Sequence, residues 1–463
     1  MVYNVYLEII EDFIKKIQAE GCYAKECEIR QVVEEAMSII KTNLDKTLEE
    51  IIEIMIDENI EELEHIRNKY PIPGYTVSVN VNNIHVKMLG GYINEQREKI
   101  QENALFDIAS MTKFYTQIIA DNLIKEKIFS CTDKIKEIDN TFLHTKLGEL
   151  TIEDILSFKV SFKTNGRLEE CQSIEEALNC LYTMEPYDIG IYNDNDLGMM
   201  LLKEVMEHMT EHTYQELLEK YIIKPLNLTD TYVKVPKDKV MLLTGSSNAD
   251  IGCVNDPNAN ALGGYSGHAG IFVSNHDLVA LGYGVAKEMI LSKEALNSAY
   301  TKGIKENRGR MGNTYIAHPQ GIEMSCIDKL EPKTNFAIRG STRVQTNIGK
   351  TTSGDIITNT ILLNPASMGL IKAYREECKI NAERVLANKP SQKLVRKYIF
   401  SRNDQYVKYD LIDPRQMVPD DDSVRKVTTS NAKLTLKLRL LNDFIKRYDK
   451  NNEKEVTLVK RMK

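Results

Sequence analysis

Two groups of strand-like segments, far apart in the chain, constrain the fold of this sequence more than any other feature. Thr76–Val81 and Ile84–Leu89, separated by two asparagines, alternate apolar and polar residues and predict a β-hairpin. Phe336–Ile348 and Ile356–Leu363 read as strands again, with a polar turn between them. Helix signals dominate residues 104–300. The order therefore predicts an α+β fold, in which an antiparallel sheet is flanked by helices and a mostly helical lobe is inserted between strands.

The two ends of the chain carry opposite charge. Residues 1–69 look helical and hold 8 basic and 17 acidic side chains, net −9, whereas residues 390–463 hold 18 basic and 10 acidic, net +8. We therefore predict an acidic helical N-terminal extension at 1–69, a central domain at 70–389 and a basic C-terminal extension at 390–463. Aromatic residues are sparse among the basic ones. We expect the ends to face each other or to solvate the chain, and nucleic acid is not an expected partner.

Composition and patterning exclude several classes of protein. Hydrophobic residues make up 42% of the chain and charged residues 27%, which excludes a wholly disordered chain. No apolar run approaches the roughly 18 residues that span a bilayer, so we expect no transmembrane segment. Acidic residues interrupt the apolar positions at the start and no secretory signal is visible, so we expect a cytoplasmic protein. The eight cysteines form no CxxC pair and are expected to be reduced thiols; we expect no metal and no cofactor.

Ser110 and Lys113 form the sharpest local motif, S-x-x-K, where the apolar spacing predicts the start of a helix. A serine and a lysine three residues apart share a helix face, so the amine can reach the hydroxyl. Free N–H groups at a helix N-terminus also favour a developing negative charge. This arrangement can make a serine nucleophilic without a histidine. The motif alone is unspecific, because three further copies begin at Ser38, Ser423 and Ser430.

The residues around Ser110 resemble those of a known family. Phe106–Lys113 is similar to the F-x-I-A-S-x-T-K signature of the serine β-lactamase and penicillin-binding-protein superfamily, in particular its esterase-like and D-aminopeptidase-like branch. Further segments resemble superfamily motifs in the same order: Leu150–Leu156 (L-T-I-x-D-L-L), Tyr192–Asp194 and Leu197–Leu202 (Y-x-N and the next helix), Tyr221–Thr231 (I-x-x-P-L-G-M-x-D-T) and Asn258–Phe272 (A-x-A-L-G-G-x-x-G-H-A-G-L-F). By this resemblance, residues 70–389 form a β-lactamase-like serine hydrolase domain.

The resemblance implies roles for individual residues. Ser110 would be the acylated nucleophile, Lys113 its activating amine, and Tyr192 a general base or proton relay. Asp194 replaces the more usual Asn and could still bond to Lys113, although it adds a negative charge. The implied activity is serine hydrolysis through an acyl-enzyme. The expected partner is a small-molecule or peptide substrate: a small ester, an amide or a D-amino-acid peptide.

The third family motif, a Lys or His followed by Thr or Ser and Gly, departs from the pattern. At its expected place the chain reads Ile338-Arg339-Gly340-Ser341. Ile338 cannot relay a proton, whereas Arg339 could restore the cation and bind a substrate carboxylate. Gly340 fits a close backbone approach, and the Ser341 N–H could complete an oxyanion hole with that of Ser110. A fold retained for binding, with catalysis lost, is therefore the alternative.

Histidines offer two further candidates. His268 lies in the glycine-rich segment that the resemblance places near the cleft, where it could contact substrate or the oxyanion, or only bond to backbone. His208–His212 matches H-x-x-E-H, which on a continuous helix would place two imidazoles for zinc. Thr210 and Thr213 indicate that the helix ends there. A zinc peptidase is thus the most distant alternative.

Overall fold

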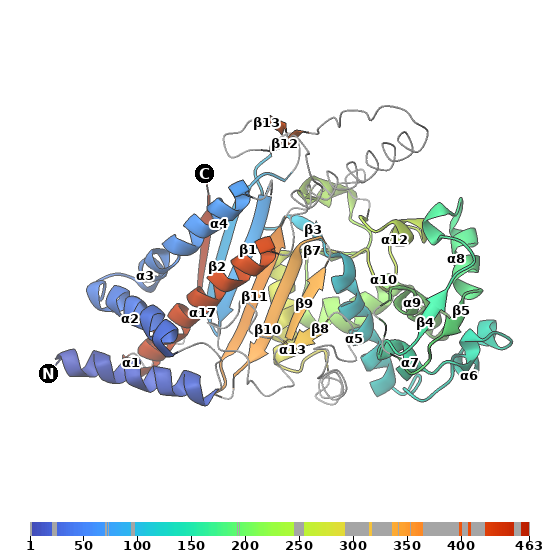
Figure 1. Ribbon diagram of the computed structural model, residues 1–463, viewed down its shortest axis with the longest axis horizontal. Coiled ribbons are helices and arrows are strands. Elements are labelled where there is room, and N and C mark those ends of the chain that lie inside the picture. The colour runs from blue at the N-terminus through green and yellow to red at the C-terminus, as the bar shows by residue number, and fades with distance from the viewer. Residues whose placement is uncertain are drawn as a thin grey trace, which may run out of the picture.

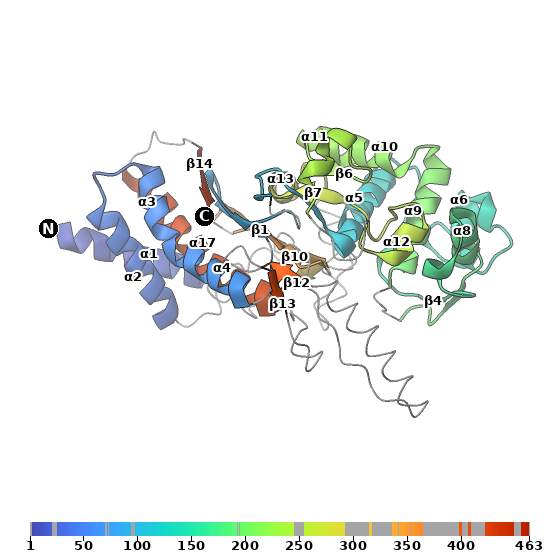
Figure 2. The same cartoon turned by 90° about the horizontal axis from the view of Figure 1, so that it is seen from above.

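The structure is a computed structural model. It describes residues 2–20, 26–69, 72, 74–93, 98–191, 193, 195–244, 254–291, 314–316, 336–340, 342–351, 353–363, 398–400, 406–408, 422–448 and 455–462. A central sheet separates a layer of long helices from a helical lobe (Figure 1). Seen from above, the sheet stands between these two helical parts (Figure 2).

The central sheet is assembled from strands at both ends of the chain. Across the sheet the seven strands are β14 (Val456–Arg461), β2 (Ile84–Gly91), β1 (Gly74–Val81), β11 (Ile356–Leu363), β10 (Val344–Lys350), β9 (Phe336–Gly340) and β8 (Thr314–Ile316). All neighbours are antiparallel except β14, which pairs with β2 in parallel, so the sheet is mixed. The predicted hairpin is confirmed, with Val79 opposite Val86. The predicted order of strands, helices and strands is also confirmed.

The single strand predicted over 336–348 is wrong, because the chain reverses in the middle of it. β9 ends at Gly340 and β10 begins at Val344, and the two strands pair with each other. Arg343 adopts a left-handed backbone with φ 62°, which makes the turn. The hydroxyl of Thr342 donates to the Asp107 carbonyl at 2.6 Å and holds this turn against the neighbouring small sheet.

Helices cover both faces of the sheet (Figures 1 and 2). One face packs against α17 (Asp422–Tyr448), which contacts β1, β11 and the N-terminal helices. The other face packs against α13 (Asn275–Ala286), which contacts β1, β10 and β11. The N-terminal helices are α1 (Val2–Ala19), α2 (Glu26–Thr42), α3 (Leu48–Met55) and α4 (Asp57–Lys69).

The segments predicted as extensions share one hydrophobic core with the sheet. This core takes in residues from α1–α4, β1, β2, β11, α17 and β14. Four leucines that alternate in the sequence are all fully buried in α17, at 434, 436, 438 and 440. Alternate positions point to nearly opposite sides of a helix. They can all be buried because α17 lies between the sheet and the N-terminal helices.

Ion pairs join the acidic first helices to the basic C-terminal segment. Lys437 pairs with Glu35 at 2.5 Å, Arg447 with Asp12 at 3.0 Å, and Lys460 with Glu53 at 2.5 Å. These contacts confirm that the oppositely charged ends face each other.

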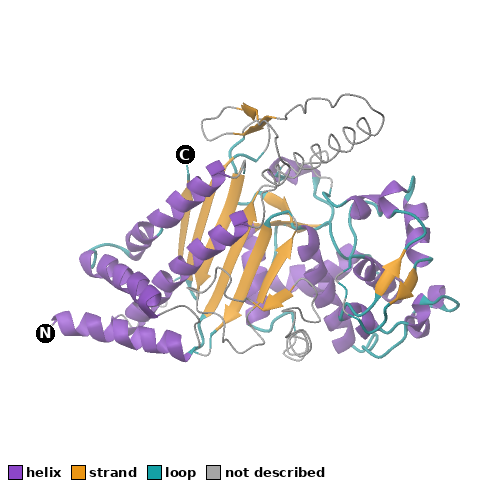
Figure 3. Ribbon diagram, viewed as in Figure 1, coloured by secondary structure: helices purple, strands orange, loops and turns teal. Residues whose placement is uncertain are grey.

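The lobe, made of helices, short strands and loops, lies to one side of the central sheet (Figure 3). Its helices are α5 (Thr112–Lys125), α6 (Ile135–Ile138), α7 (Ile152–Leu156), α8 (Ile174–Tyr182), α9 (Leu197–Thr210), α10 (Tyr214–Leu218), α11 (Lys224–Leu226) and α12 (Pro257–Ala261). One small sheet of the lobe contains β3 (Leu105–Asp107), β7 (Phe272–Ser274) and β6 (Thr231–Tyr232). A second contains β4 (Ser161–Lys163) and β5 (Glu185–Tyr187). Outside the lobe, β12 (Tyr398–Phe400) pairs with β13 (Tyr406–Lys408). Across the described residues, we find no helix with the length and apolar character needed to cross a membrane.

Candidate active site

Ser110 lies in a tight turn between β3 and α5. Ala109–Met111 form a 3-10 helix, η1, that leads directly into α5. Ala109 has φ 44°, which is unusual for a residue with a side chain. The Asp107 carboxylate stabilises this conformation by accepting the Ala109 N–H at 2.8 Å. The half-buried Ser110 is thereby presented at the first turn of a helix, as the motif predicts.

The Asp107 carboxyl is buried beneath this turn. Its second oxygen accepts the N–H of Asn255 at 2.7 Å. Burial raises the pKa of Asp107 to about 6, although the two backbone N–H bonds and nearby His268 oppose the shift. Asp107 thus links the turn that carries Ser110 to the segment before α12.

Lys113 is buried in the first turn of α5, with 4% of its side chain exposed. Its Nζ pairs with the Asp196 carboxylate at 2.6 Å and lies 5.9 Å from the centre of the Phe158 ring. Asp196 is the residue before α9, where an aspartate usually caps the helix, yet its side chain makes no cap bond. Asn195 does so instead, by accepting the Gly198 N–H at 3.0 Å. The Asp196 carboxylate is therefore left for Lys113.

The segment that carries the Y-x-D residues is fixed beside Phe158. The Asn193 N–H donates to the Phe158 carbonyl at 2.7 Å, and the Asn193 amide donates to the Ser161 hydroxyl at 2.8 Å. Tyr192 and Asp194 themselves lie outside the described residues, and their roles stay a prediction. Their described neighbours place the segment next to the partners of Lys113.

β9 packs against η1, so the strand on which the third motif was expected runs beside Ser110. A Cβ added at Gly340 would overlap the carbonyl oxygen of Ile108, which explains why this position needs glycine. Ile338 on the same strand is fully buried. Of Arg339 only the backbone is described, and Ser341 lies outside the described residues, so the oxyanion and carboxylate roles stay predictions.

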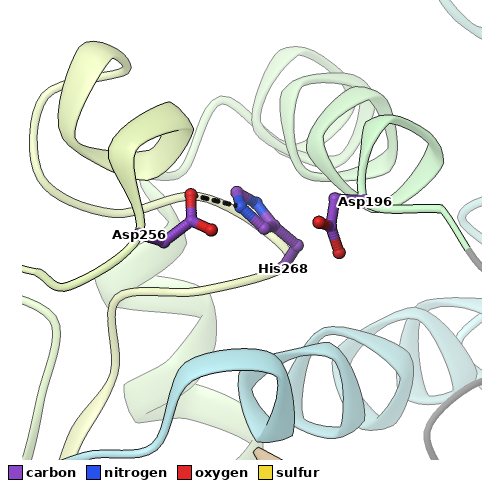
Figure 4. A group of neighbouring side chains, drawn as sticks. All are labelled: Asp196, Asp256 and His268. Carbon is purple, nitrogen blue, oxygen red and sulfur yellow. Dashed lines mark hydrogen bonds and ion pairs between the residues drawn. The ribbon is translucent and has the colours of Figure 1, made fainter. Parts of the chain in front are cut away.

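His268 is fully buried on the loop between α12 and β7 and is held by Asp256 (Figure 4). Its Nε2 is hydrogen-bonded to Asp256 Oδ1 at 2.9 Å. Burial by itself raises the pKa of Asp256, but the bond and charge of His268 lower it below its usual value overall. A Cβ at Gly267 would overlap the Met199 carbonyl oxygen, so this loop lies tight against α9. The prediction that His268 contacts substrate or the oxyanion is not tested by this geometry.

Asp196, Asp256 and His268 come together from three segments (Figure 4). One potential ligand atom from each lies within 4.8 Å of the others. Oxygen and imidazole donors of this kind suit several divalent metals. Each side chain already has a partner, however: Asp196 binds Lys113, and Asp256 binds His268. We therefore describe the group as part of the polar network around Lys113.

Comparison with known proteins identifies the family. A family model described as Beta-lactamase matches residues 44–326, which is more than half of the chain. The chain belongs to the beta-lactamase family. A relative from Escherichia coli strain K12, named "Putative D-alanyl-D-alanine carboxypeptidase", is 26% identical over 231 residues, or 42% of this chain and 53% of that protein. The chain thus spans about half the length of that relative.

Comparison with solved structures confirms the predicted fold. A class C beta-lactamase from Rhodobacter sphaeroides has a TM-score of 0.52 at 15% identity, over 68% of this chain and 98% of that chain. FmtA from Staphylococcus aureus has a TM-score of 0.51 at 18% identity, over 66% of this chain and 84% of that chain. The resemblance drawn from the ordered motifs is therefore confirmed at the level of family and fold.

The H-x-x-E-H motif, the one feature from outside the beta-lactamase family, does not lie on one helix. α9 ends at Thr210, and Glu211 adopts a left-handed backbone with φ 54°. His208 instead bonds to Asp139 at 2.7 Å. The two imidazoles therefore do not face one another one helical turn apart, which the zinc alternative requires.

Three acidic residues of this beta-lactamase-family site were not predicted from the sequence. Asp107 and Asp196 had no signal beyond their places next to the recognised motifs. Asp256 did have one, because Asp256-Pro257 is typical of a helix start, with aspartate as the cap and proline at the first helical position. Their pairing with the turn at Ser110, with Lys113 and with His268 depends on tertiary contacts.

Proposed function

We propose that this chain is a serine hydrolase that forms an acyl-enzyme on Ser110 and acts on a small ester, an amide or a D-amino-acid peptide. The observation that carries the proposal is a buried lysine, Lys113, in the first helical turn after Ser110, which directly follows the strained backbone of Ala109. Family membership supports a hydrolase of this type. The name of the Escherichia coli relative supports D-alanyl peptides as the first substrates to try.

The proposed chemistry has two steps. In the first, Ser110 Oγ attacks the carbonyl carbon of the substrate while its proton passes to Lys113, and the leaving group departs with a proton from the same relay. In the second, water attacks the acyl-enzyme, the ester bond to Oγ breaks and Ser110 recovers its proton. Backbone N–H groups at η1 and after Gly340 would hold the oxyanion. Tyr192 is the proposed proton relay.

We assign Asp196 to the same machinery as a positioning residue. The carboxylate holds Lys113 Nζ at 2.6 Å and would stabilise the ammonium that forms when the lysine takes the Ser110 proton. An aspartate plays the equivalent part behind the histidine of a serine–histidine–aspartate triad. The arrangement proposed here is therefore serine, lysine and aspartate in series.

Covalent labelling tests the proposal directly. The full chain is treated with a fluorophosphonate or a fluorescent penicillin, and its intact mass is measured. We expect one adduct that Ser110→Ala abolishes and that Ser38→Ala, which changes an exposed serine of another S-x-x-K motif, leaves unchanged. An adduct that persists in the Ser110→Ala variant contradicts the assignment.

The role of Asp196 has a separate test. Asp196→Asn keeps the size of the side chain and removes its charge, and we expect about 10²–10⁴-fold slower acylation, the usual contribution of an acid–base system. A shifted pH–rate profile and partial recovery in Asp196→Glu would identify positioning of Lys113. An unchanged rate and profile in Asp196→Asn would exclude Asp196 from the machinery, while labelling of the unmodified protein would still support the hydrolase.

A second candidate function is a beta-lactamase-type fold kept for binding. It is favoured by Ile338, which is buried at the position where the family resemblance would place the cation of the third motif, so that one proton-relay group would be absent. If Arg339 restores the cation, Arg339→Ala should weaken turnover of carboxylate-bearing substrates more than of matched substrates without the carboxylate. Equal losses on both would remove the carboxylate role. No adduct with any probe in the unmodified protein would favour the binding function.

A further inference from the structure

Two cysteines lie next to each other on the outer side of the lobe. Cys171 follows a short 3-10 helix, η4 (Leu168–Glu170), and Cys180 lies on α8. Their sulfur atoms are 3.7 Å apart, which is van der Waals contact. Both residues are partly exposed to solvent. They belong to none of the motifs that the proposed hydrolase uses.

The surrounding backbone holds the two thiols in this position. Cys171 Sγ lies 3.7 Å from the Arg167 carbonyl, and Cys180 Sγ lies 3.8 Å from the Asn165 carbonyl. The Ser173 hydroxyl accepts the Glu176 N–H at 3.1 Å and fixes the start of α8 between them. A disulfide needs the sulfurs about 2 Å apart. Rotation of the two side chains about their torsions has to close the remaining distance between the sulfur atoms.

We propose that Cys171 and Cys180 form a reversible disulfide, and that this pair is a redox modification site for an oxidised low-molecular-weight thiol such as glutathione disulfide. One cysteine thiolate attacks the small disulfide, forms a mixed disulfide and releases one thiol. The second cysteine then displaces the other thiol. The two protein thiols lose two electrons and two protons, and the small disulfide becomes two thiols.

The cysteine pair lies on elements that pack against segments of the candidate site. η4 packs against α12, the helix that Asp256 caps. Ile174, the first residue of α8, lies beside Gly263 at the start of the loop that carries His268, at 3.1 Å from a Cβ added to that glycine. A disulfide would therefore restrain a unit that touches two segments of the polar network around Lys113.

Protonation of the thiols sets the pH dependence of this exchange. Burial raises the pKa of the Cys171 thiol, and the hydrogen bond and charge of Cys180 raise it further. Because the thiolate is the nucleophile, exchange should be slow at neutral pH and faster as the pH rises. Glu176 and Glu170 are the charged groups that also face this thiol, and both act in the same direction.

The positions of the trypsin cleavage sites allow a specific test of this disulfide. Trypsin cleaves after Arg167 and Lys203 but nowhere between them, so one peptide carries both cysteines and no other. The folded full chain is incubated in glutathione redox buffers, alkylated and digested. We expect this peptide to become lighter by two hydrogen atoms and inert to alkylation, and dithiothreitol to reverse both changes. Slower hydrogen exchange across η4 and α8 should accompany oxidation.

Matched controls separate a true pair from general thiol reactivity. The tryptic peptide with Cys131, which is also partly exposed, should stay open to alkylation in the same digest. Cys171→Ser and Cys180→Ser should each leave the remaining cysteine alkylatable or as a mixed disulfide with glutathione. If the two-cysteine peptide stays fully alkylatable under oxidising buffer, or if Cys171 and Cys180 are found joined to other cysteines, the inference is overturned. Neither outcome bears on whether Ser110 is acylated.

Discussion

Replacing Arg439 with methionine tests whether the C-terminal helix belongs to the folded core. Arg439 is fully buried on α17. Its guanidinium pairs with Glu20 at 2.7 Å and with Asp355 at 3.3 Å, and both carboxylates are 2% exposed. Arg439→Met keeps most of the apolar length of the side chain and removes only the charge and its hydrogen bonds. Two buried carboxylates then lose a shared cation.

The expected loss of unfolding free energy depends on the partners that each carboxylate retains. Asp355 retains Lys16 at 3.0 Å and Lys446 at 3.7 Å, whereas Glu20 retains the neutral Ser353 hydroxyl at 2.6 Å. Removing one partner of a buried ion pair costs about 3–5 kcal/mol. Because Asp355 keeps two cationic partners, we expect a loss at the lower end of this range, about 3 kcal/mol of unfolding free energy. Changing Glu20 to glutamine as well should recover part of that loss.

The pH dependence provides a second signature. Burial raises the pKa of Asp355, but Arg439 and Lys16 lower it to about 2 overall. A carboxyl with a lowered folded pKa stabilises the protein above its unfolded pKa of about 4, and this contribution is lost as the pH falls through about 2. The difference between the unmodified protein and Arg439→Met should therefore shrink as the pH falls from about 5 to 2.

Urea unfolding at pH 7 measures the effect, with Arg447→Met as the matched control. Arg447 lies on the same helix and pairs with Asp12 of α1 at 3.0 Å, but 44% of its side chain is exposed. Exposed ion pairs contribute about 0–1 kcal/mol. If Arg439→Met costs no more than Arg447→Met, α17 does not pack between the sheet and the first helices, and the reasoning fails.

Three other predictions concern the site and the charged ends. Burial raises the folded pKa of Asp107 to about 6, so its contribution to the unfolding free energy is fully present below about pH 4 and is lost as the pH rises through 6. Asp107→Asn should remove about 3 kcal/mol of the pH dependence of the unfolding free energy between pH 4 and 6, as measured by urea unfolding. An unchanged pH dependence in this variant would contradict the prediction. Gly340→Ala should force β9 away from the Ile108 carbonyl, with slower Ser110 labelling and about 1–3 kcal/mol lower stability; normal labelling would place β9 elsewhere. Because the basic C-terminal segment pairs with acidic helices, the full chain should show no salt-sensitive binding to nucleic acid, and tight binding at low salt would refute this.

Local chemistry made much of the site readable from the sequence. The S-x-x-K motif lies where the periodicity predicts a helix start, and the structure has Ser110 and Lys113 at that start. At the start of α7, Thr151 and Asp154 form a capping box within the Leu150–Leu156 segment that resembles the family motif. Gly340 was singled out for a close backbone approach, and it meets the Ile108 carbonyl. Each of these depends on residues close in sequence or on one backbone clash.

The four alternating leucines of α17 show where sequence patterning fails. A period of two predicts a strand and a period of 3.6 predicts a helix, because each assumes that one face is buried. α17 is buried on several sides, so its apolar positions follow neither period. The same holds for the two ends of the chain. Their charges could be counted from the sequence, but their packing on the sheet could not be predicted from it.

The sequence by itself determined the broad order of strands and helices, the helix start at Ser110 and the presence of Lys113 in its first turn, because local propensity and spacing decide these. Tertiary structure alone decided that Asp196 binds Lys113, that Asp256 holds His268, and that α17 and β14 complete the sheet and its core. Residues far apart in the chain meet only when the whole core closes. Their partners are set by the geometry of packing, which a pattern of neighbouring residues does not encode.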